Sequence, residues 1–93
     1  MVGVSSNVVQ DLLNEHARRA AASEYDRATC IASIAAARDA VAAIHTAENA
    51  SYGDAVIQQL SRLADGGTLP GGEYVSGRSI VIALLDDIRL ASD

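Results

Sequence analysis

Apolar residues recur at intervals of three and four along most of the chain, which is the pattern of amphipathic helices. No glycine or proline lies between Val4 and Tyr52, and this stretch is rich in the helix formers Ala, Arg, Glu and Leu. The first apolar stripe predicts a helix over about 7–22, with the polar residues 5–7 as N-cap candidates. The apolar positions of this helix are Val8, Val9, Leu12, Leu13, Ala17 and Ala20.

A second helix is predicted over about 24–49. Ser23 followed by Asp26 resembles a capping box, which favours a break after the first helix; one continuous helix is the alternative. The apolar positions of the second helix form a narrow seam, of the kind that packs against another helix. We predict that this seam is a subunit interface. It consists of Cys30, Ile31, Ile34, Ala37, Val41 and Ile44.

Glycine divides the second half of the chain. The apolar periodicity predicts a third helix over about 54–65 and a fourth over about 79–91. Between them, residues 66–77 contain five of the seven glycines and the only proline, which predicts a loop; a short strand pair, 68–69 with 74–75, is the alternative within it. The chain of 93 residues is therefore expected to be a single all-α domain, a three- to four-helix bundle with a Gly-rich loop before the last helix.

The side chains available for a core are small, since the sequence has 18 alanines, three tyrosines and no phenylalanine or tryptophan. Burial of apolar surface contributes roughly 25 cal/mol per Å², and ordering the chain costs about 1.5 kcal/mol per residue. For an isolated chain of this size, the free energy gained by burial and the free energy lost by ordering the chain nearly cancel. We therefore predict a homo-oligomer, most simply a two-fold dimer, with a compact Ala-rich monomer as the alternative.

Charge and cysteine content exclude several classes of function. The chain has no lysine, seven arginines and a net charge of −5, which is the wrong sign for a general nucleic-acid binder. Cys30 is the only cysteine, so an intrachain disulfide and a cysteine-based zinc site are excluded. No apolar run has the length of a membrane span, and the first residues do not resemble a signal peptide. We expect a cytoplasmic protein without metal or cofactor, and the Ala- and Arg-rich, Lys-free composition suggests a bacterial or phage genome.

Three titratable residues look meaningful but are not expected to act chemically: His16 as a metal ligand, and Asp86 with Asp87 as a catalytic pair. His16 has no second histidine or cysteine at ligand spacing, so no metal site is predicted there. Asp86 and Asp87 diverge by about 100° on a helix and cannot face each other as an acid–base pair.

Arg38 and His45 lie seven residues apart and would project from the same side of a helix. In a symmetric dimer, two such pairs would converge, with His45 as general base on a ribose hydroxyl and Arg38 binding the phosphate. The segment 38–45 resembles the Arg–polar–spacer–His pattern of the HEPN family of helical ribonucleases. That resemblance implies a dimeric, metal-independent RNA-cleaving protein, with Arg38 and His45 as its catalytic pair and Asp39 as the polar neighbour. The alternative is that Arg38 pairs with a carboxylate at the edge of the stripe.

Residues 72–79 are similar to a phosphate-binding loop in which Arg78 replaces the lysine. Only 14 residues follow Ser79, so a nucleotide-binding α/β domain is excluded. A simpler anion site at a helix start remains, in which Arg78 binds a phosphate and Tyr74 stacks on the ligand. Its predicted residues are Tyr74, Ser76, Gly77, Arg78 and Ser79. The alternative is an ordinary helix start capped by Ser76 or Ser79.

These patterns favour a small, acidic, helical accessory or regulatory protein that acts by binding, as a homo-oligomer or as an inhibitor of a protein partner. A small anionic-ligand binder using residues 72–79 is the first alternative. A HEPN-like ribonuclease using Arg38 and His45 is the second.

Overall fold

The structure is a computed structural model, and it describes residues 5–24, 27–44, 52–66 and 75–92. These residues form four α-helices and no strand, which confirms the all-α class. The helices are α1 (Ser6–Ala22), α2 (Arg27–Ala42), α3 (Tyr52–Gly66) and α4 (Val75–Ser92).

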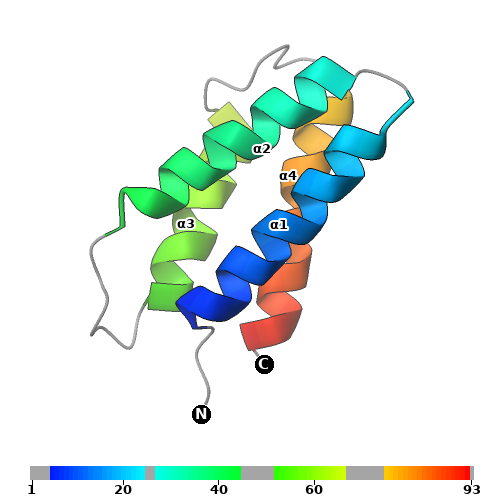
Figure 1. The fold of residues 1–93 in the computed structure, drawn as a ribbon. Coiled ribbons are helices and arrows are strands. Elements are labelled where there is room, and N and C mark those ends of the chain that lie inside the picture. The colour runs from blue at the N-terminus through cyan, green and yellow to red at the C-terminus, as the bar shows by residue number, and fades with distance from the viewer. Residues whose placement is uncertain (1–4, 25–26, 45–51, 67–74, 93) are drawn as a thin grey trace.

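The four helices run alternately up and down, so that each is antiparallel to the next in sequence (Figure 1). Helix α1 packs against α2 and α4, and α3 packs against the same two helices. Helices α2 and α4 also contact each other across the bundle, and both therefore contribute to its centre. The start of α1 and the end of α4 lie at the same end of the molecule (Figure 1).

Helix α1 has well-defined ends. Ser5 is its N-cap, with an extended backbone and a side-chain Oγ that accepts a hydrogen bond from the Val8 N–H at 3.3 Å. At the other end, Ser23 leaves the helical conformation and its N–H donates to the Ala20 carbonyl at 3.2 Å. The expected break between the first two helices is confirmed, although Asp26 lies outside the described residues.

Helix α2 is shorter than the sequence predicts, because it spans Arg27–Ala42 and not about 24–49. Ser23 and Glu24 precede it in non-helical conformations. At its end, the Ile44 N–H donates to the Val41 carbonyl at 3.1 Å, so the last turn tightens to a three-residue spacing and the helix stops. No glycine or proline marks this end, which explains why the sequence pattern overshoots it.

Helices α3 and α4 are longer than predicted. Helix α3 begins at Tyr52 and includes Gly66, whereas α4 begins at Val75 and includes Ser76 and Gly77. The predicted loop over 66–77 is therefore wrong at both of its ends, and its middle, residues 67–74, lies outside the described residues. Val75 is helical, so the alternative strand pair is also wrong at that residue.

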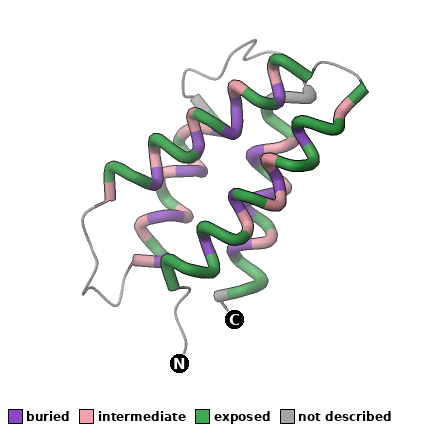
Figure 2. Tube along the Cα trace, in the orientation of Figure 1, coloured by how far each residue is buried: buried purple, intermediate pink, exposed green. Residues whose placement is uncertain are grey.

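The core runs through the middle of the bundle, and the buried side of every helix faces it (Figure 2). Aliphatic side chains from all four helices make up its largest cluster: Val9, Leu13, Ala37, Val41, Val56, Leu60, Leu84, Leu85 and Ile88. A smaller cluster joins Ala20 of α1 to Cys30 and Ile34 of α2. Two polar side chains, His16 and Ser33, are buried with these residues.

Candidate functional site

Four of the six residues of the seam that the sequence predicts as a subunit interface lie on the inner face of α2, whereas Ile31 lies on its exposed side. Cys30, Ile34, Ala37 and Val41 are 0–7% exposed and pack within the chain's own core. Ile44 is half-buried against the same core. An interface between subunits could use these side chains only if the bundle opened, so a surface for a second copy has to lie elsewhere.

Helix α2 also has apolar residues on its outer side, beside exposed charged residues. We call Ala28, Ile31, Ala35 and Ala42 the α2 outer face; all four are exposed, and Ile31 is 45% exposed. Helix α3 differs, because its exposed residues are all polar: Asp54, Gln58, Arg62 and Asp65. Exposed apolar side chains grouped on one side of a helix are typical of an interaction surface. The α2 outer face is therefore the candidate interaction surface of this protein.

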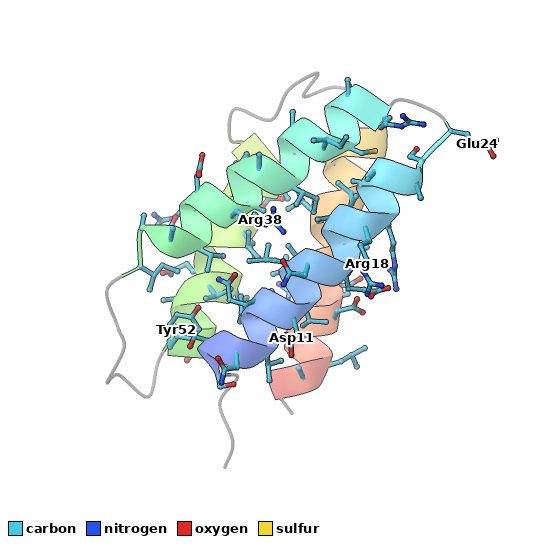
Figure 3. All side chains as sticks on the ribbon, viewed as in Figure 1. Asp11, Arg18, Glu24, Arg38 and Tyr52 are labelled. Atoms are coloured by element: carbon cyan, nitrogen blue, oxygen red, sulfur yellow. The ribbon has the colours of Figure 1, made fainter. Side chains whose placement is uncertain are left out.

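Two charged residues border the α2 outer face. Arg38 is exposed and lies on the side of α2 that faces α1, where its Nη2 donates a hydrogen bond to Oδ1 of Asn14 at 2.8 Å (Figure 3). Asp39 is exposed, and it forms no side-chain hydrogen bond or ion pair with any described residue. Asp39 also lies in the last turn of α2, where a carboxylate opposes the helix dipole. Among the described residues, no interaction compensates for a carboxylate at this position.

The predicted ribonuclease pair is not assembled within the part of the chain that the structure describes. Arg38 is bonded to Asn14, a neutral partner, and not to the carboxylate that the sequence alternative expects. His45 lies outside the described residues.

Arg78 has a structural partner, in contrast to its predicted part in anion binding. Its Nε donates to the Ala64 carbonyl at 2.7 Å, and its Nη2 donates to the Asp65 carbonyl at 3.1 Å. Both oxygens belong to the last turn of α3, where helix carbonyls lack intrahelical partners. Arg78 therefore caps α3 and joins it to α4.

The remaining described residues of the predicted anion site lie inside α4 and do not precede it. Helix α4 begins at Val75, which places Ser76 and Gly77 in its first turn and Ser79 one turn further along. The alternative, with Ser76 or Ser79 as N-cap, is wrong for the same reason. Tyr74 lies outside the described residues.

The sequence pattern does not predict the interaction between His16 and Asp87. His16 is 1% exposed, and its Nε2 lies 2.7 Å from Oδ2 of Asp87, which joins α1 to α4. One signal was present, because His16 occupies the buried stripe of α1 between Leu13 and Ala20. The partner could not be found from the sequence, since 71 residues separate the two.

The described ranges contain neither a metal-binding cluster nor a membrane-spanning helix. No group of three or more His, Cys, Asp or Glu residues there could hold a metal ion. None of the four helices is long and apolar enough to cross a membrane. Comparisons with protein-family models, with curated proteins and with solved structures gave no match.

Proposed function

We propose that this protein acts by binding and not by catalysis, and that the α2 outer face is its contact surface. One observation carries the proposal: four apolar residues lie together on the exposed side of α2, where the chain itself does not cover them. The polar outer side of α3 shows that a water-exposed helix of this chain need not be apolar.

The chemistry of the α2 outer face suits a helical partner. Three of its four residues are alanines, and small side chains let two helix backbones approach closely. Ile31 is the one large side chain on this face, and its exposed part is available to fill a gap between helices. The face offers no nucleophile and no acid–base pair, so contact is the role that its residues support.

The anion-binding and ribonuclease alternatives stay predictions. Each depends on a residue outside the described ranges, Tyr74 for the first and His45 for the second. Among the described residues, Arg78 is engaged in capping α3.

The proposal is tested by placing a charge on the α2 outer face. We expect Ala35→Glu to abolish the complexes that the wild-type chain forms, because burying an unpaired carboxylate at a helix–helix contact is strongly unfavourable. Native mass spectrometry of freshly purified protein measures these complexes, whether the second component is another copy or a different protein. Gln58→Glu introduces the same carboxylate on the exposed side of α3 and serves as the matched control.

Two results would contradict the proposal. The first is a wild-type chain that forms no complex at concentrations up to about 0.5 mM. The second is a complex that survives Ala35→Glu while circular dichroism shows the variant to be folded.

A further inference from the structure

The charges beside the α2 outer face lie on opposite edges of it. Successive residues of an α-helix are rotated by about 100°, so Ala28, Ala35 and Ala42, seven apart, lie nearly in line. Relative to that line, Arg38 lies about 60° to one side and Asp39 about 40° to the other. One edge is therefore positive and the other negative at the same height along α2.

We propose that the partner of the α2 outer face is a second copy of this chain, with the two α2 helices running in the same direction. A two-fold axis parallel to both helices places the positive edge of one α2 against the negative edge of the other. Arg38 then lies beside Asp39 of the second copy, and the symmetry repeats this ion pair on the other side. This inference rests on the proposed function, because it names the partner of the same surface.

The opposite orientation brings like charges together. In an antiparallel two-fold pair, equivalent edges of the two helices face each other. Arg27 lies on the same edge as Arg38, about 20° further from the line of alanines, so this edge would meet a second arginine edge. Like charges placed in this way are destabilising, as they are within a helix.

The parallel arrangement also gives Asp39 a partner. In the single chain, this carboxylate is unpaired among the described residues and opposes the dipole of α2. The Arg38 guanidinium has five N–H groups, of which the bond to Asn14 uses one nitrogen. It can therefore keep Asn14 and also donate to a carboxylate of the second copy.

A contact made by a single pair of helices is small, so we expect a weak dimer that depends on concentration. Sedimentation equilibrium at concentrations up to about 0.5 mM measures such an association. We expect Asp39→Arg and Arg38→Asp each to raise the dimer dissociation constant about tenfold or more, because each turns two attractive pairs into two repulsive ones. Asp11→Arg on α1 and Arg62→Asp on α3 make the same charge changes at exposed positions away from this face and should leave the constant unchanged.

Two combinations are expected to restore the dimer. In the double variant Arg38→Asp with Asp39→Arg, the edges exchange signs and again attract. In an equimolar mixture of the two single variants, each Arg38 or Asp39 that remains meets an opposite charge, so a mixed dimer should form while neither variant pairs with itself. These combinations also cover the case in which one single variant folds poorly, which circular dichroism detects.

The inference is overturned if the wild type sediments as a single chain, or if neither combination restores the association that the single variants lose. A monomer that forms an Ala35-dependent complex with a different protein would overturn it while leaving the proposed function intact. If the wild type forms no complex that Ala35→Glu disrupts, both the inference and the proposed function are contradicted.

Discussion

His16, a fully buried polar residue of α1, forms a side-chain contact with Asp87 of α4. The carboxylate accepts the hydrogen bond, so Nε2 of His16 carries the proton that it receives. The His16 side chain is 1% exposed and the Asp87 side chain 36%, so the contact lies at the edge of the core. The contact therefore specifies how α1 and α4 are placed relative to each other.

We expect Asp87→Ala to lower the free energy of unfolding by about 1–3 kcal/mol, because it leaves a buried N–H without an acceptor. Urea unfolding followed by circular dichroism measures this. Asp86→Ala is the matched control: its carboxylate lies on the exposed side of α4, 3.8 Å from Arg89, where an ion pair contributes less than about 1 kcal/mol. Equal effects of the two substitutions would show that the His16 contact does not stabilise the fold.

Tyr52, at the start of α3, should make the free energy of unfolding depend on pH in the alkaline range. Burial raises the pKa of its phenol above the ordinary value of 10.0. The folded chain therefore keeps this proton at pH values where the unfolded chain has lost it. The contribution of Tyr52 to stability is complete below pH 10 and is lost as the pH rises above that value. Tyr52→Phe should weaken the fall in unfolding free energy over this alkaline range, and an unchanged fall would contradict the assignment.

At the scale of the helices, Arg78 joins the end of α3 to the start of α4. We expect Arg78→Ala to lower the free energy of unfolding by about 0.5–1.5 kcal/mol, the usual net contribution of a hydrogen bond. Thermal or urea unfolding measures the loss. Arg62→Ala removes an exposed arginine of α3 that has no hydrogen bond or ion pair with described residues, and it should have little effect. An Arg78→Ala variant as stable as the wild type would leave its guanidinium free for another role.

The two faces of α2 should respond differently to the same substitution. Ala37 is 0% exposed, so Ala37→Leu forces three extra carbon atoms into a packed core and should cost about 1–3 kcal/mol. Ala35→Leu adds the same atoms to the exposed outer face and should change stability by about 0.5 kcal/mol or less. Unfolding curves of both variants at low micromolar concentration test this. A larger loss of stability in Ala35→Leu than in Ala37→Leu would show that Ala35, and not Ala37, faces the core.

The sequence predicts the elements of this fold better than their ends or their contacts. Spacing places Leu13, Leu60 and Ile88 on buried stripes, because the helical period is a local property. The end of α2 depends on a tightened last turn, and no glycine or proline there allows this turn to be predicted. The sequence does not distinguish the inner side of α2 from its outer side, because apolar residues lie on both.

Contacts between distant segments were beyond the sequence for a different reason. The Arg78 cap joins residues 13 and 14 positions apart, across a segment whose path the sequence does not specify. The opposite charges of Arg38 and Asp39 are present in the sequence, but whether they lie beside an exposed face depends on which side of α2 faces the core.

At the scale of the whole molecule, three helices cover the inner face of α2 and leave its outer face exposed. Among the described residues, the fully buried side chains are aliphatic apart from His16 and Ser33, so contact across the outer side of α2 would add to a small buried area. A small bundle of this kind gains stability when another helix covers that face.

Oxidative cross-linking at the centre of the α2 outer face tests this account most directly. Cys30→Ala removes the natural thiol, and Ala35→Cys then places the only thiol on the face that we assign to a second copy. The account predicts a covalent dimer that forms rapidly, because paired α2 helices bring the two sulfur atoms within disulfide distance. Gln58→Cys in the same background is the control on α3. A dimer that forms no faster with Ala35→Cys than with Gln58→Cys would contradict it.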